Sequence, residues 1–138
     1  MSRFRFIIPL FAALLTACAG GAEKRVRSEP PIQYQRYAGP LLPEIPFSRL
    51  SHWDEAGPGE IVVWTRVGRA YLLRLEQPCR ALEHSVMLRI GARTGRVRPG
   101  VDHVEAGTER CRIRSIQQLD LDRLEADRAA ARRPVMRE

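Results

Sequence analysis

The 138-residue sequence has few of the residues that metal and catalytic sites usually need. It contains three histidines and three cysteines, and no histidine stands at ligand spacing from a cysteine. It has no Cys-x-x-Cys pair and no Gly-x-Ser-x-Gly turn, which argues against thiol redox chemistry and against a hydrolase with a nucleophile elbow. We therefore expect no metal, no cofactor and no catalytic residue, although sequence leaves open a Ser-His-Asp site assembled from distant residues.

Lysine is also nearly absent. All but one of the 23 basic residues are arginine, Lys24 being the exception, and 16 acidic residues leave a net charge of +7. Such a bias can follow genome composition as well as selection for guanidinium chemistry. A charge excess of this size does not by itself identify an anionic partner.

Long apolar runs are missing apart from one short run over residues 6–15, preceded by Arg3 and Arg5. It is too short to cross about 30 Å of hydrocarbon and has the anatomy of a secretory signal. The sequence Leu15-Thr16-Ala17-Cys18 follows, and it resembles the processing site of a bacterial lipoprotein. The resemblance implies that residues 1–17 form a signal peptide and that Cys18 carries the lipid. An ordinary signal peptide, with Cys18 incidental, is the alternative.

The residues after Cys18 bear on the membrane that the lipid enters. They are alanine and glycine, whereas an aspartate there resembles an inner-membrane retention signal of Gram-negative lipoproteins. We therefore expect an outer-membrane protein that faces the periplasm. Its expected partners are the membrane, through the lipid, and an envelope protein or an anionic envelope component. Nucleic acid is not expected there.

Proline and glycine divide the rest of the chain. Residues 18–46 are proline-rich and polar, which predicts a lipidated N-terminus on a flexible tether. Residues 47–132 form the predicted domain, and residues 133–138 a basic tail. Five apolar residues of the tether are exceptions that could dock on the domain or on a partner: Tyr34, Tyr37, Leu41, Leu42 and Ile45.

The predicted domain is mainly β. Residues 61–67 and 70–76 predict a hairpin that reverses at Gly68, because β-branched and aromatic residues dominate both segments. Three further strands are predicted over residues 85–90, with Val86, Leu88 and Ile90 inward, and over 101–105 and 111–116. Strands separated by turns indicate a small antiparallel sheet or barrel.

A helix is predicted at the C-terminus, running to about Arg132. Either Asp120 or Asp122 can cap it. With Asp120 as the cap, Leu119 and Leu124 stand at hydrophobic-staple positions. With Asp122 as the cap, Glu125 completes a capping box.

Cys79 and Cys111 are the cysteines left after Cys18. In an exported protein such a pair predicts one disulfide. The loop of about 33 residues would be worth about 3–4 kcal/mol. A redox or metal pair is the less favoured alternative.

A wider pattern surrounds these cysteines. Trp64, Tyr71-Leu72-Leu73, Pro78-Cys79, Asp102 before Val104, and Arg110-Cys111-Arg112-Ile113 with Ile116 resemble an uncharacterised family of small bacterial lipoproteins. The resemblance covers residues 47–122. It implies a domain of unknown function in a secreted setting, agrees with the disulfide, and brings no catalytic residues.

Two surfaces are candidates for binding. Arg110, Arg112 and Arg114 alternate, so on a strand they share one face that suits phosphate or carboxylate groups. Other arginines could extend this face: Arg66, Arg74, Arg89, Arg93, Arg96 and Arg98. The alternative is the ordinary solvated face of a half-buried sheet. Trp53, before Gly57-Pro58-Gly59, could anchor an interface or pack on the sheet, whereas Trp64 is expected in the core.

These features predict a lipid-anchored, non-enzymatic binding or envelope-assembly factor. One alternative is a cationic module that binds lipid A or peptidoglycan. A small periplasmic hydrolase is another.

Overall fold

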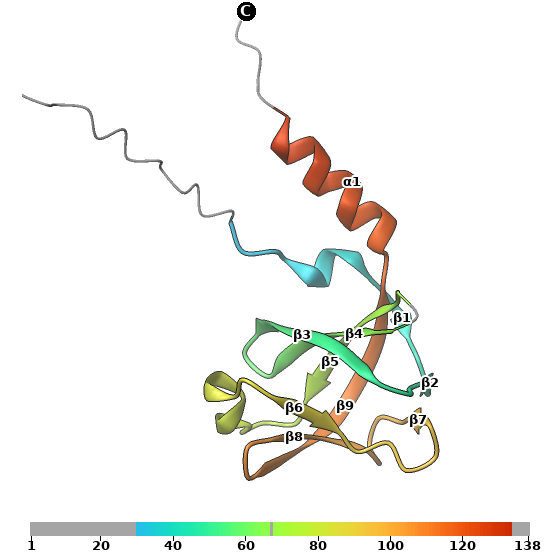
Figure 1. Cartoon of the computed structure of the whole chain (residues 1–138), viewed down its shortest axis with the longest axis vertical. Coiled ribbons are helices and arrows are strands. Elements are labelled where there is room, and N and C mark those ends of the chain that lie inside the picture. The colour runs from blue at the N-terminus through green and yellow to red at the C-terminus, as the bar shows by residue number, and fades with distance from the viewer. Residues whose placement is uncertain (1–29, 67, 134–138) are drawn as a thin grey trace, which may run out of the picture. The chain divides into compact units, whose positions relative to one another are not determined.

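The structure, a computed structural model, describes residues 30–66 and 68–133, and strands make up 45% of them. The main sheet is antiparallel and curls into a nearly closed barrel in the order β3-β4-β5-β9-β8-β6, with β1 beside β9 (Figure 1). A small ribbon pairs β2 with β7. The elements are η1 Tyr34–Tyr37, β1 Ala38–Leu41, β2 Ile45–Pro46, β3 Leu50–Gly57, β4 Glu60–Thr65, β5 Ala70–Leu75, η2 Arg80–His84, β6 Leu88–Ile90, β7 Arg96–Val97, β8 His103–Ala106, β9 Glu109–Leu119 and α1 Leu121–Arg132.

The predicted hairpin is confirmed as β4 and β5, and both of its faces are buried. Successive side chains of a strand point to opposite faces, so the hairpin serves two cores. The inner core fills the barrel and includes Ile61, Val63, Tyr71, Leu73, Leu75, Cys79, Leu88, Val97, Val104, Cys111, Ile113 and Ile116. The outer core, on the opposite face, consists of Tyr34, Tyr37, Val62, Ala70, Leu72, Leu119 and Leu124.

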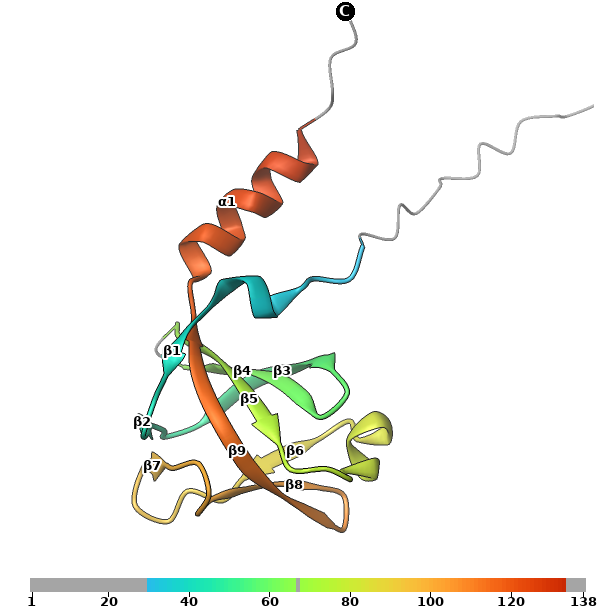
Figure 2. The ribbon, with the colours of Figure 1, turned by 180° about the vertical axis from the view of Figure 1, so that it is seen from behind.

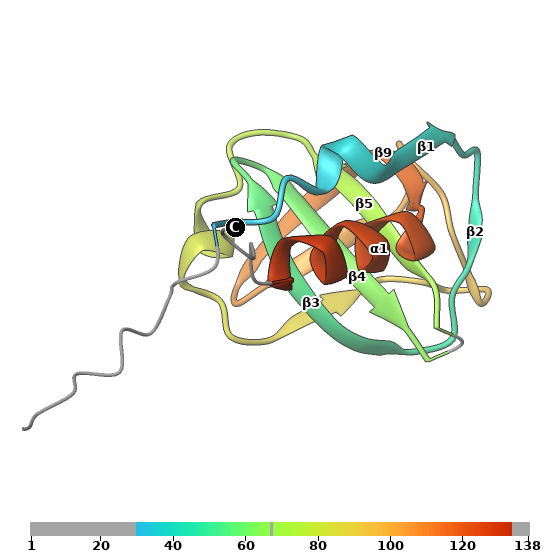
Figure 3. The same ribbon diagram turned by 90° about the horizontal axis from the view of Figure 1, so that it is seen from above.

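The outer core is covered by η1 and α1. Figure 3 shows α1 lying across the hairpin with η1 beside it. Tyr34 donates a hydrogen bond to Asp54 (2.7 Å), and Tyr37 donates one to Asp127 (2.9 Å). Burial, and then the bond to Asp54, raise the pKa of Tyr34 well above its ordinary value, so the phenol stays protonated. These bonds fix the covering elements to the sheet and to each other.

Of the two predicted caps of helix α1, the structure shows Asp120. Asp120 Oδ1 accepts a hydrogen bond from the backbone N–H of Arg123 at 3.0 Å, so Asp120 is the N-cap. Leu119 and Leu124 are both buried in the outer core, as the staple predicts. The prediction of a helix running to Arg132 is confirmed.

The prediction of a flexible tether over residues 18–46 is wrong for residues 34–46. Residues 34–46 form η1, β1 and β2, and Tyr34, Tyr37 and Ile45 are buried. A high proline content does not prevent this, because Pro40 and Pro46 lie in strands that pair along one edge. The domain therefore begins ahead of the predicted boundary at Phe47. Residues 18–29 lie outside the described residues.

Three strand predictions also need correction, and one strand was missed. The missed strand is β3, whose sequence is largely polar; it pairs with β4 alone, and none of its residues is fully buried. The strand expected over 85–90 shortens to β6, since Val86 is 89% exposed instead of facing inward. The strand expected from Val101 begins at His103, whereas β9 is longer than predicted.

The disulfide between Cys79 and Cys111 is confirmed, with the two Cα atoms 5.8 Å apart. It ties the segment before η2 to β9, across 32 residues of sequence. Figure 2 shows β9 running down the barrel wall, with β1 beside one end and β8 beside the other. The described residues contain no helix that is both long and apolar enough to cross a membrane.

The corrected domain boundary has a direct test. Tyr34→Ala should lower the free energy of unfolding by about 3 kcal/mol, because it empties a site in the outer core. Leu41→Ala, in the same segment but 66% exposed, should change it by less than about 0.5 kcal/mol. Urea unfolding measures both. Equal, small effects would contradict a structural role for η1.

Candidate anion-binding face

Strand β9 places its arginines by simple alternation. Cys111 and Ile113 point into the inner core, so Arg110 and Arg112 point outward and are exposed. A register shift between β5 and β9 makes Arg114 an extra, outward residue of a bulge, because Leu75 pairs with Ile113 but Arg74 pairs with Ser115. All three arginines are therefore exposed, and the bulge interrupts the alternation at Arg114.

The three arginines differ in their surroundings. Arg110 Nε donates to His103 Nε2 at 2.9 Å and lies 3.8 Å from Glu105 Oε1, so part of its charge is already offset. Arg112 and Arg114 are exposed, and no carboxylate of the described residues lies within ion-pair distance of either. Their guanidinium groups are available to an anion.

Most of the arginines expected to extend this face are engaged elsewhere or stand apart. Arg74 is paired with Glu60 at 2.7 Å, and Arg96 with Glu44. Arg89 stands opposite Glu105 in register. The backbone of Arg98 forms a tight turn, and Arg66 is exposed in the β4–β5 connection.

Two open hollows flank the face. One, of about 500 Å³, is lined by Glu76, Gln77, Arg112 and neighbouring residues. The other, of about 380 Å³, is lined by Gly91, Arg93 and Glu105 among others. Val101, His103 and Arg110 line both and so form the ridge between them. The site is thus a basic ridge with acidic residues in both hollows: Glu76 lines the larger one, and Asp102 and Glu105 line the smaller one.

Asp102 supports this ridge from behind. It is 8% exposed, and its Oδ2 accepts a hydrogen bond from the backbone N–H of Arg98 at 2.7 Å. Its carbonyl accepts from Ile113 N at 3.0 Å, which joins the turn to β9. Asp102 therefore has a structural role, in holding the loop that precedes His103.

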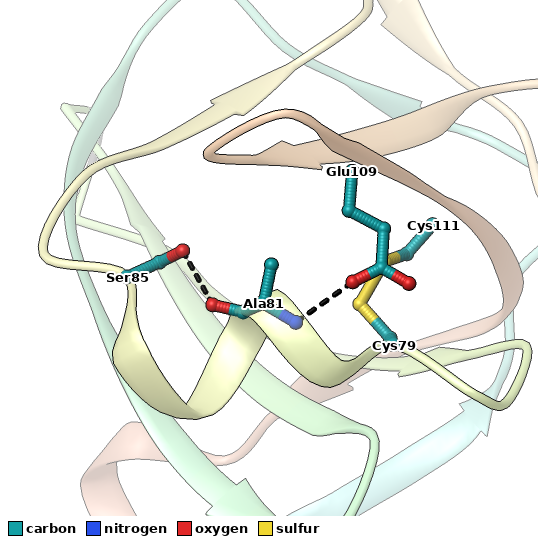
Figure 4. The surroundings of a disulfide bond; sticks show 5 residues. All are labelled: Cys79, Ala81, Ser85, Glu109 and Cys111. Atoms are coloured by element: carbon teal, nitrogen blue, oxygen red, sulfur yellow. Dashed lines mark hydrogen bonds between the residues drawn. A yellow bond between two sulfur atoms is a disulfide. The ribbon is translucent and has the colours of Figure 1, made fainter.

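The disulfide has an acidic neighbour that the sequence did not reveal. Glu109 Oε2 accepts a hydrogen bond from the backbone N–H of Ala81 at 2.7 Å, and Ser85 Oγ donates to Ala81 O at 2.6 Å (Figure 4). Cys79, Cys111 and Glu109 lie close enough to suggest a metal site, with ligand atoms within 4.8 Å of one another. Because the sulfurs are bonded to each other, neither is a thiolate ligand, and Glu109 serves to fasten η2 to β9.

Trp53 lies at the seam where β3 and β6 approach. It is half-buried against the inner core, and its indole N–H donates to Val86 O at 3.3 Å. Beside it, Val86 and Met87 are 89% and 79% exposed. Trp64, expected in the core, is half-buried at the edge of the outer core, and the His52 ring stacks on it.

The three histidines lie in separate places and have different neighbours. His52 stacks on Trp64, His84 is exposed in η2, and His103 contacts Arg110 and Glu105. Within residues 30–66 and 68–133, no serine is hydrogen-bonded to a histidine.

Glu60 shows how a paired arginine affects a carboxylate. Burial acts to raise the pKa of Glu60, but hydrogen bonds from Gln35 and Arg74, with the Arg74 charge, outweigh it. The pKa of Glu60 is lowered as a result. Arg74 is consequently committed to the fold and is a poor candidate for ligand binding.

Comparisons with known proteins identify a family without a known activity. A model described as "Family of unknown function (DUF6491)" matches residues 1–135, and the chain belongs to this family. The match confirms the expectation of an uncharacterised family and extends beyond the 47–122 span that carried the resemblance. No curated protein and no solved structure matches the chain.

The Glu60–Arg74 pair predicts a pH-dependent stability. Because folding lowers the pKa of Glu60, its stabilising effect is present above the ordinary value of 4.5 and is lost as pH falls through the lowered value. Glu60→Gln should cost about 0.5–1 kcal/mol at pH 7, since the Arg74 side chain is 44% exposed, and the difference should shrink as the pH falls below 4.5. Urea unfolding across pH tests this, with Glu125→Gln, on the exposed side of α1, as the control.

Proposed function

We propose that this member of the DUF6491 family is a lipid-anchored, non-enzymatic protein of the bacterial outer membrane. It faces the periplasm and binds an anionic envelope component. The binding surface is the face formed by Arg110, Arg112 and Arg114 on β9. Its ligands are phosphate or carboxylate groups, such as those of lipid A or peptidoglycan.

The anchor rests on the N-terminal sequence. A basic start, a short apolar run and Leu15-Thr16-Ala17-Cys18 together have the form of a lipoprotein signal. The family match starts at residue 1 and so includes this segment. Acyl chains contribute about 0.8 kcal/mol per buried methylene, so two or more chains hold a domain of this size firmly at a membrane.

The main support for anion binding is the state of Arg112 and Arg114. Both are exposed, and neither forms an ion pair within the described residues, whereas Arg74 and Arg96 each pair with a glutamate. A guanidinium group forms two parallel hydrogen bonds to phosphate or carboxylate. Arg110 and Arg112 are in register with β8, so the backbone that carries these two arginines is held in the sheet. Such a surface loses little conformational freedom when a ligand binds.

The ordinary alternative is that these arginines only solvate the outer face of the sheet. Solvation alone requires neither saturable binding nor a preference for these positions over other arginines. Charge-dependent binding that is specific to Arg112 and Arg114 separates the two possibilities.

A second candidate function is protein binding at the seam beside Trp53. The observation in its favour is the neighbouring pair Val86 and Met87, which are almost fully exposed next to a half-buried tryptophan. Aromatic residues with apolar neighbours often anchor protein interfaces. An envelope-assembly role would use this surface. We do not propose a hydrolase, because no observation in the described residues favours one.

The anchor predicts a specific acylation. In cells given an alkyne analogue of palmitate, the full-length protein should be labelled and should fractionate with membranes. Cys18→Ser should abolish the labelling, because Cys18 is the proposed acceptor. The double variant Cys79→Ser/Cys111→Ser should keep it. Labelling that persists in Cys18→Ser would rule out the proposed anchor.

The cationic face predicts salt-sensitive binding to an anionic envelope polymer. Purified full-length protein in neutral detergent should sediment with peptidoglycan sacculi, and less so as salt rises. Arg112→Gln/Arg114→Gln should weaken binding about tenfold, through the loss of charge-assisted hydrogen bonds. Arg36→Gln/Arg49→Gln removes the same charge from exposed sites elsewhere and should have little effect.

Two results would count against this ligand class. The first is that the two double variants bind sacculi equally well and also bind diphosphoryl lipid A vesicles equally well. The arginines of β9 would then have no specific role in binding. In-cell crosslinking that recovers one envelope protein at high salt, and loses it in Val86→Ser/Met87→Ser, would favour the second candidate.

A further inference from the structure

His103 occupies the centre of the candidate anion-binding face. It lies on β8, opposite Arg112 in register, and its side chain is 20% exposed. Gly91 packs against the ring so closely that a Cβ there would lie 2.9 Å from His103 Cε1. Gly91 N also donates to His103 O at 3.0 Å. The ring is therefore held between the Gly91 backbone and Arg110.

The hydrogen bond from Arg110 is one that only a neutral imidazole can accept. A guanidinium group has donors and no acceptor, so His103 Nε2 must accept the bond from Arg110 Nε. Only a neutral imidazole has a lone pair for this. Glu105 Oε1 lies 3.4 Å from the same Nε2 and 3.8 Å from Arg110 Nε. Neutral His103 and Glu105 together hold Arg110 against β8.

A proton on His103 reverses this arrangement. The imidazolium has donors at both nitrogens and cannot accept from Arg110, so two cations would then face each other. Its Nε2–H can instead donate to Glu105. Arg110 would thereby lose the hydrogen bond that it donates to His103 and compete for Glu105, while the ridge between the hollows gains a positive charge.

The surrounding charges favour a surplus of positive charge. The carboxylate of Asp102 is buried and accepts from Arg98 N, and it makes no hydrogen bond or ion pair with the ring. Glu105 is shared between β6 and β9 neighbours. The charged groups that face or border His103 are Glu76 beyond β5, Arg89 on β6, Arg93 after β6, Asp102 before β8, Glu105 on β8, and Arg110 and Arg112 on β9.

We propose that His103 is a proton-operated switch of the anion-binding face. Neutral His103 holds Arg110 and keeps the affinity for anions low; protonated His103 releases Arg110 and raises that affinity. Histidine changes charge between about pH 5 and 8, so binding should strengthen as the medium acidifies. By linkage, a bound anion should in turn favour the protonated form. This inference rests on the proposed function, since it needs an anion to bind at this face.

The test needs an anion whose own charge is constant. Phosphate monoesters gain a proton near about pH 6, so sucrose octasulfate is the better probe. Calorimetry with full-length protein in neutral detergent would measure its affinity at about pH 7.5 and 5.5, the range in which histidine titrates. We expect the affinity of the unaltered protein to rise roughly fivefold or more on acidification.

A matched pair of variants assigns the effect. His103→Gln keeps a hydrogen-bonding side chain but cannot titrate, so its affinity should be nearly independent of pH. His84→Gln, in exposed η2, should keep the full pH dependence. As a second readout on the unaltered protein, the Arg110 Nε–H signal in NMR should change as the His103 ring titrates.

The possible failures are distinguishable. Two results would overturn the switch alone. One is an affinity for octasulfate that needs Arg112 and Arg114 but does not change with pH; the other is a pH dependence that persists in His103→Gln. The switch would also be overturned if the NMR signal of Arg110 Nε–H stayed constant while the His103 ring titrates. Binding that does not depend on Arg112 and Arg114 at either pH would overturn the proposed ligand face and the switch together.

Discussion

The pairing of β9 along both of its edges is the constraint on which the rest of the structure depends. One edge pairs with β5, and the other pairs first with β8 and then with β1. The same strand carries one cysteine of the disulfide, the bulge at Arg114 and, at its end, the N-cap Asp120. Displacing β9 would therefore open the barrel and detach α1. This backbone also fixes the spacing of the exposed arginines.

The bulge lets one strand serve two cores. Before it, Cys111 and Ile113 point into the barrel, and after it Ile116 returns to the interior while Leu119 reaches the outer core. Helix α1 and η1 cover the outward face of β4 and β5 but leave that of β8 and β9 open to solvent. The arginine face is exposed because nothing in the described chain packs over this half of the barrel, and His103 is half-buried beneath it.

Local patterns predicted much of this correctly. The hairpin followed from β-branched and aromatic runs, the disulfide from two leftover cysteines, and the C-terminal helix from two possible caps, Asp120 and Asp122, of which the structure selects Asp120. The failures have different causes. Residues 34–46 are proline-rich but pair with β9 and β7, which are remote in sequence. Strand β3 is polar but pairs with its sequence neighbour β4. Val86 alternates with Leu88, yet β6 begins only at Leu88, so Val86 stays in solvent.

The sequence by itself determined the central hairpin, the cysteine pair, the C-terminal helix and the alternation of Arg110, Arg112 and Arg114. These depend on side-chain type at short spacing, which one strand or one helical turn can satisfy. Only the tertiary structure decided which arginines are paired, that Glu109 fastens η2, and that His103 meets Arg110 between two hollows. Those contacts depend on register between strands and on the path of loops, and hydrogen bonds and packing across the whole barrel fix both.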